Sequence, residues 1–144
     1  MEAKQERNII VVKETELCTI SVDLTLSIIK AYCKQHMEGE EMRQNLLALL
    51  DLIHVFKPKY ILGNVRALHY LDLQDSNWFW QKIVMSLRGS SVVKWARIED
   101  PHSMVELSTM QIRLRLEEEG IAKSELQFDA FPDEESALHW LLQE

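Results

Sequence analysis

The fold is decided by residues 42–64, which read MRQNLLALLDLIHVFKPKYILGN. Apolar residues recur in its first part at three- and four-residue spacing, namely Met42, Leu46, Leu49, Leu50, Ile53 and Phe56. This spacing predicts an amphipathic helix over residues 40–56. Pro58 ends the helix because proline cannot continue it and restricts the residue before it. Residues 60–62 then predict a short buried strand, so the segment is a helix followed directly by a strand.

The same alternation of strands and helices continues on both sides of this segment. Short β-branched or alternating apolar runs predict strands at residues 9–12, 18–22, 26–35, 60–62, 91–98 and 126–130. The helical pattern predicts three further helices, at residues 75–88, 103–119 and 133–142. Asp75 and Ser76 are favoured caps for the first of these, and Ser103 with Glu106 has the pattern of a capping box. The helix after Ser103 is expected to bury Leu107, Met110 and Leu114.

These elements predict an α/β (α+β) fold in a single domain over residues 1–144, with residues 1–7 flexible. Helical crossovers of this length join parallel strands. The two opening strands are joined by short turns and should pair antiparallel. The expected architecture is a mixed sheet of five or six strands with four helices.

The charge of the chain is concentrated near its C-terminus. The 144 residues have a formal net charge of −7, yet residues 1–116 hold 15 basic and 14 acidic residues. Residues 117–144 hold nine acidic residues and one lysine. Nucleic acids and anionic membranes both require a basic face, so we expect neither as a partner. No apolar run reaches the length of a membrane span, and the charged start is unlike a signal peptide. We therefore expect a cytoplasmic protein with no integral membrane segment.

The common catalytic and cofactor-binding motifs are absent from the sequence. It contains no G-x-G-x-x-G, no G-x-x-x-x-G-K, no G-x-S-x-G and no C-x-x-C, and its four dispersed glycines cannot build a phosphate cradle. Cys33 and His36 form the one cysteine–histidine pair at metal-ligand spacing. On a strand their side chains would point to opposite faces. We expect no catalytic residue, no cofactor and no metal.

The most informative polar segment is residues 63–80, which read GNVRALHYLDLQDSNWFW. It follows a buried strand at the carboxyl edge of the predicted sheet, where α/β proteins bind ligands and partners. The candidate interaction or regulatory residues are Asn64, Arg66, His69, Asp72, Asp75, Ser76 and Trp78. A structural role is the alternative, in which Asp75 and Ser76 cap the helix and the aromatic residues cover the core. Neighbouring helical residues point about 100° apart, so at least one of Trp78, Phe79 and Trp80 should be half-exposed or more.

The organisation of the chain resembles the STAS-like superfamily. The resemblance is carried by FKPK at residues 56–59, YILGN at residues 60–64 and NW at residues 77–78. The segment FDAFPDEESALHWL, residues 128–141, is similar to the final strand and helix of that family. Within the superfamily, the chain looks like uncharacterised relatives of the anti-sigma-factor antagonist type (SpoIIAA-like). The resemblance covers nearly the whole chain.

This resemblance implies a STAS-like domain that works by protein association and not by catalysis. In antagonist members, a kinase phosphorylates the serine of an Asp-Ser pair at a helix start, and the phosphate switches partner binding. The matching pair is Asp75-Ser76, which makes Ser76 a candidate phosphosite. The antagonist pattern continues D-S-(S/G)-G-(L/I), whereas N-W-F follows here at residues 77–79. That departure weakens the transfer of the switch to Ser76.

Three functional hypotheses follow from the sequence. The first is a non-enzymatic, regulatory interaction module whose partner is a protein, with a second copy of the chain as one candidate. The second is a domain that binds a small apolar or lipid-like molecule in a pocket between Trp78, Trp80 and the sheet. The third and least favoured is an enzyme of unrecognised type, which would need titratable residues clustered in a cleft.

Overall fold

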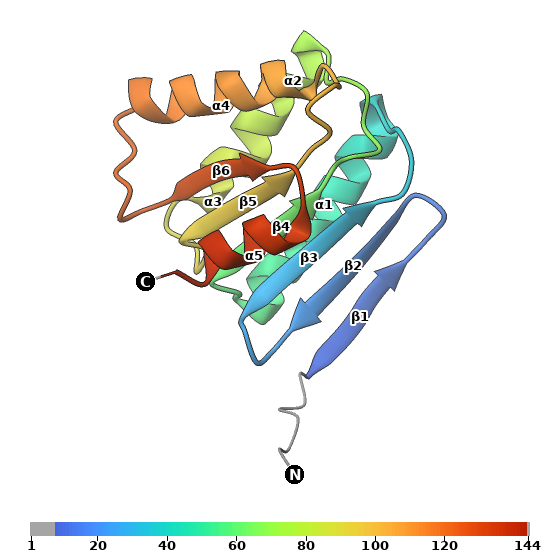
Figure 1. Cartoon of the computed structure of the whole chain (residues 1–144), viewed down its shortest axis with the longest axis vertical. Coiled ribbons are helices and arrows are strands. Elements are labelled where there is room, and N and C mark those ends of the chain that lie inside the picture. The colour runs from blue at the N-terminus through green and yellow to red at the C-terminus, as the bar shows by residue number, and fades with distance from the viewer. Residues whose placement is uncertain (1–7, 144) are drawn as a thin grey trace.

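The sheet has six strands, and their order in space is their order in the chain (Figure 1). The computed structural model describes residues 8–143, so the prediction about residues 1–7 lies outside the described residues. The strands are β1 (Ile9–Glu14), β2 (Cys18–Asp23), β3 (Ile28–Cys33), β4 (Tyr60–Asn64), β5 (Lys94–Ile98) and β6 (Gln127–Phe131). β1, β2 and β3 pair antiparallel, and β3 to β6 pair parallel. The predicted mixed sheet is confirmed.

Helices cover both faces of this sheet (Figure 1). They are α1 (Gly39–Phe56), α2 (Leu73–Phe79), its π-helical continuation η1 (Trp80–Val84), α3 (Met85–Leu87), α4 (Val105–Glu118) and α5 (Glu134–Leu141). Counted with α2–η1–α3 as one helix, they are the four that the sequence predicts. The three crossover helices pack on one face and α5 alone packs on the other. Within residues 8–143, no helix combines the length and the hydrophobicity needed to cross a membrane.

The face under α5 has its own small core. Ala137 and Leu141 of α5 lie against four sheet residues, Ile28, Leu62, Ala96 and Ile98. Asp133 caps this helix by accepting a hydrogen bond from the Ser136 amide at 2.8 Å, which lowers the pKa of the Asp133 carboxyl. Acidic residues gather at the same helix start, where the dipole favours them. Leu142, expected in this core, is exposed because the helix has ended there.

The start of the second helix differs from the prediction. Asp72 is the N-cap, and its Oδ1 accepts from the Asp75 amide at 2.7 Å. Asp75 and Ser76 therefore lie inside the first turn and not at the cap. Asp72, three residues before Asp75, is an equally good cap. With Asp72 as the cap, the Asp75 carboxylate is free to contact residues that are distant in the sequence.

The orientation of α4 also differs from the prediction. Leu107, Met110 and Leu114, expected in the core, are between 50% and 58% exposed. The buried face instead carries Val105, Ser108, Thr109 and Ile112. The capping box is wrong too, because the helix begins at Val105 and the Ser103 hydroxyl accepts from the Val105 amide. The two hydroxyls turn inward because they serve as partners for a buried arginine described below.

Candidate functional site

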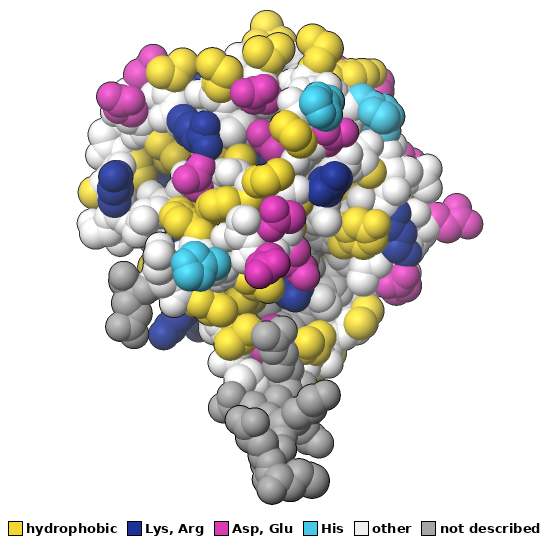
Figure 2. Space-filling model, viewed as in Figure 1, with side chains coloured by type: hydrophobic (Ala, Val, Ile, Leu, Met, Phe, Trp, Pro, Cys, Tyr) yellow, Lys and Arg dark blue, Asp and Glu magenta, His cyan; other side chains and the backbone are white. Residues whose placement is uncertain are grey.

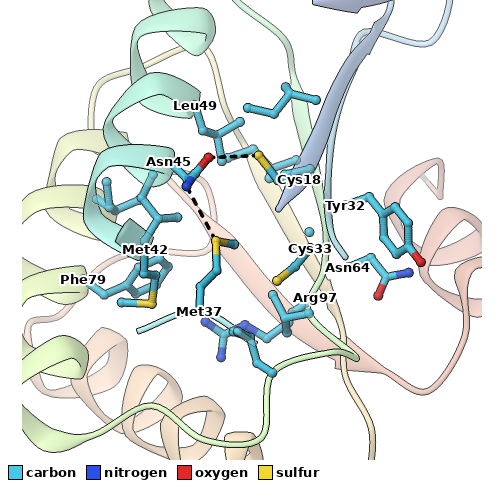
Figure 3. A pocket seen from close by; sticks show the side chains of 18 of the residues that line it. Cys18, Tyr32, Cys33, Met37, Met42, Asn45, Leu49, Asn64, Phe79 and Arg97 are labelled. Carbon is cyan, nitrogen blue, oxygen red and sulfur yellow. Dashed lines mark hydrogen bonds between the residues drawn. The ribbon is translucent and has the colours of Figure 1, made fainter. Parts of the chain in front are cut away.

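An apolar cavity of about 110 Å³ lies between α1 and the sheet (Figure 3). The sheet contributes Ile20, Ala31 and Gly63 to its wall, and α1 contributes Leu46 and Leu49. The loop that follows β4 closes one side with Val65, Leu68 and Leu71. Protein interiors are packed with few voids larger than a water molecule, so a cavity of this size needs a cause in the sequence.

The cause is a pair of small residues, Ala31 and Gly63, at the middle of one row of the sheet. In the strand register, Ile20 of β2 lies opposite Ala31 of β3, then Gly63 of β4 and Arg97 of β5. The neighbouring row carries large side chains throughout, namely Val22, Ile29, Ile61, Trp95 and Phe128. Ala31 and Gly63 cannot fill the space beneath α1 that their larger neighbours fill, and the cavity lies above them.

Arg97 lines the cavity and is only 3% exposed. Its guanidinium lies 5.4 Å from the ring centre of Trp95 and 5.6 Å from those of Phe79 and Phe128. Burial lowers the pKa of Arg97 to about 10, while the charge of Glu99 acts in the opposite direction. The side chain is therefore still a cation at neutral pH.

Two hydroxyls of α4 hold one nitrogen of this guanidinium. Arg97 Nη1 donates to Thr109 Oγ1 at 3.2 Å and to Ser108 Oγ at 3.4 Å. The Thr109 hydroxyl in turn donates to the buried Glu99 carboxylate. Among residues 8–143, Arg97 has no carboxylate in direct contact and no acceptor for Nε or Nη2. A buried cation thus faces an apolar space with three of its five N–H groups unused.

The thiol and amide groups of the cavity wall form hydrogen bonds within the protein. Asn45 accepts from the Cys18 thiol at 3.0 Å and donates to the Met37 sulfur at 3.6 Å (Figure 3). Burial raises the pKa of Cys33 to about 11, and its thiol donates to the Gln35 carbonyl. Cys33 is therefore a neutral thiol at physiological pH, which removes the nucleophile from any triad built on it.

A loop latch, formed by His36, Glu38, His69 and Tyr70, joins two loops beside the cavity. His36 Nδ1 accepts from the His69 amide at 3.1 Å, and the imidazole rings stack 5.1 Å apart. Glu38 contacts His36 Nε2 at 2.9 Å and accepts from the Tyr70 hydroxyl. Both hydrogen bonds lower the pKa of Glu38, and the one from Tyr70 has the larger effect. Because Met37 and Leu68 lie within the same loops and line the cavity, the latch fixes one side of its wall.

The predicted loop residues separate into distinct groups. His69 belongs to the loop latch. Asn64 lines the cavity, and its Oδ1 accepts from the Arg66 amide at 3.1 Å. The Arg66 guanidinium points elsewhere and donates to the Pro132 carbonyl at 2.6 Å. These three residues therefore do not form one site.

The remaining predicted residues gather at the start of α2. Asp72 caps the helix, and the buried Asp75 carboxylate accepts from the Gly39 amide at 3.0 Å and from Arg43 at 3.3 Å. Arg43 also packs over the Trp78 ring at 5.4 Å. Trp78 is half-buried whereas its two aromatic neighbours are buried, as the helical spacing predicted. Ser76 is half-buried in the first turn, and its role as a phosphosite stays a prediction.

The pocket predicted between Trp78, Trp80 and the sheet is wrongly placed. Only Phe79 of that aromatic cluster lines the cavity, which lies under α1 instead. The sequence-based prediction did not include Arg97, the charged residue that lines the cavity, although the sequence contains an indication of its role. Residues 94–99 read KWARIE, and a charged residue at the inward position of a buried strand is unusual.

Comparisons with protein-family models, curated proteins and solved structures found no match to this chain. No group of three or more histidine, cysteine or acidic side chains suited to a metal ion occurs in the described part of the chain.

Proposed function

We propose that this chain is a non-enzymatic binding module that holds a small apolar molecule in the cavity beneath α1. The observation that carries the proposal is the cavity itself, because the small residues Ala31 and Gly63 keep open a space that an ordinary core would fill. An apolar pocket with a few convergent polar groups is the usual form of a ligand site. A chain of this size with two cysteines and an extensive apolar core needs no disulfide, which favours a cytoplasmic setting.

The direct test is binding of a neutral probe, 1-butanol, followed by the shift of the Trp95 indole N–H in nitrogen–proton spectra. Burying four methylene-sized groups contributes about 3 kcal/mol, so we expect a dissociation constant of several millimolar. Gly63→Val should weaken this binding by more than about tenfold because its methyl groups enter the cavity. A Cβ on Gly63 meets its nearest neighbours at 4.0 Å, an ordinary contact, so the variant should fold and gain about 1 kcal/mol of stability.

Gly63→Ala is the graded control, since it adds one methyl group and should weaken binding less. If 1-butanol does not bind the wild-type chain, or binds Gly63→Val equally well, the proposal is wrong.

A STAS-like interaction module is the second candidate function, and one surface favours it. The α4 stripe, formed by Met104, Leu107, Met110 and Leu114, is exposed along the helix. Figure 2 shows hydrophobic side chains along the top edge of the molecule, where α4 lies in Figure 1. An antiparallel pairing of two such helices, centred between Met110 and Gln111, places Leu107 of each copy opposite Leu114 of the other. The stripe is thus complementary to itself, and a second copy of the chain is the partner that it fits.

Leu107→Glu tests this second candidate. We expect the wild-type chain to dimerise in sedimentation experiments and the variant to be monomeric, because a charge would be buried in the interface. The exposed position should leave the unfolding free energy within about 0.5 kcal/mol. Gln81→Glu, which adds the same charge on another helix, should leave the dimer intact. A wild-type chain that is monomeric at all concentrations would exclude the self-association.

A further inference from the structure

We propose that Arg97 makes the cavity selective for a monocarboxylic acid, whose carboxylate pairs with the guanidinium while its apolar body fills the space beneath α1. This inference rests on the proposed function and names the chemical class of the ligand. Arg97 is 3% exposed and lines the cavity, so the ligand would meet its charge inside the protein.

The free edge of the guanidinium has the geometry that a carboxylate requires. Nη1 is occupied by Ser108 and Thr109, which leaves Nε and Nη2 side by side. These two N–H groups form the fork that binds the two oxygens of a carboxylate in parallel. In the described part of the chain, the buried polar side-chain atoms without partners are Asp23 Oδ2 and Arg43 Nε. Nε and Nη2 of Arg97 are not among these atoms, and Arg97 is one of the residues that line the cavity.

The charge around Arg97 favours a single negative charge. The three aromatic rings stabilise the faces of the cation but accept no hydrogen bond at its edge. Glu99 balances part of the charge through the Thr109 hydroxyl, without touching the guanidinium. A dianion such as phosphate would therefore leave surplus negative charge in an apolar space, whereas a monocarboxylate would complete the pairing.

Packing alone does not require an arginine at this position. An unbranched apolar side chain would fill the same space between the rings, and replacing buried charges by apolar groups is often neutral or stabilising. The cation becomes favourable when an anion occupies the adjoining space. The cavity of about 110 Å³ is smaller than the roughly 150 Å³ that holds one benzene, so it suits a short acid such as butyrate or isobutyrate.

The test compares butyrate with 1-butanol on the full chain at neutral pH, by titration followed in nitrogen–proton spectra. We expect the wild-type chain to bind the acid about tenfold or more tightly than the alcohol, because hydrogen bonds to charged groups are the strong ones. Arg97→Met should weaken butyrate binding by about 100-fold and change 1-butanol binding by less than about threefold. Arg97→Lys keeps the charge but loses the fork, so its butyrate affinity should fall between those of the other two proteins.

Arg113→Met, on the exposed side of α4, is the matched control and should bind butyrate like the wild-type chain. Isobutyrate with its alcohol, 2-methyl-1-propanol, repeats the comparison for a branched body, and a preference for the acid in either pair supports the proposal. Equal affinity of acid and alcohol for the wild-type chain would overturn it while leaving the neutral-ligand function intact. Absence of binding by all four probes would overturn both. The wild-type comparison decides the matter even if the Arg97 variants do not fold.

Discussion

Asp75→Ala is expected to lower the free energy of unfolding by about 3 kcal/mol and the melting temperature by about 10 °C. The Asp75 carboxylate is buried and joins two helices that are distant in sequence. It accepts from the amide of Gly39, the first residue of α1, whose own cap residue Glu38 makes no side-chain capping bond. It also pairs with Arg43, so its loss leaves both a helix-start amide and a largely buried cation without their partner.

Chemical denaturation of the variant measures this effect. Asp72→Ala is the comparison, because Asp72 is a local cap of α2 and its loss should cost about 1 kcal/mol. Asp75→Asn retains an acceptor for the Gly39 amide but lacks the charge, so its stability should lie between those of the wild type and Asp75→Ala. Equal effects of Asp72→Ala and Asp75→Ala would show that Asp75 does not hold α1 in place.

Leu141→Ala is expected to cost about 3 kcal/mol, because α5 is the single helix on its face of the sheet. The Leu141 side chain is 0% exposed and lies among sheet residues that no other helix covers. Truncating a fully buried leucine removes its transfer free energy and leaves a cavity, which together cost about 2–5 kcal/mol.

Leu142→Ala is the matched control for Leu141→Ala. The adjacent side chain is 43% exposed, so its truncation should change the unfolding free energy by less than about 0.5 kcal/mol. Thermal and denaturant unfolding of the two variants give the comparison directly. Similar losses of unfolding free energy in the two variants would contradict the burial of Leu141 and the exposure of Leu142 at the end of α5.

The sequence predicts elements well where the local pattern and the tertiary structure agree. Residues 42–64 do so, because the apolar spacing, the proline stop and the following strand all belong to one crossover. In α4 they disagree. Two of its leucines, Leu107 and Leu114, face outward, since Arg97 requires the hydroxyls of Ser108 and Thr109 on the inner face.

The candidate site was only partly predictable for a related reason. The polar loop after β4 suggested a site near the carboxyl edge of the sheet, and several of its residues do border the cavity or its latch. The cavity itself depends on Ala31 and Gly63 standing opposite each other. These residues are 32 positions apart. Only the register of the assembled sheet brings them together, and no local pattern contains that register.

The strand order also bears on how the chain folds. Because β1 to β6 follow one another in space as in sequence, each parallel pairing closes a connection of 26, 29 or 28 residues, at 34–59, 65–93 and 99–126. The entropy cost of closing a loop grows slowly with its length, and proteins with local pairings fold faster than those with distant ones. A nascent chain can therefore add one strand at a time to a growing edge as it is synthesised. Only α5, whose contacts reach back to β4 and β5, must wait until residues 134–141 have been synthesised.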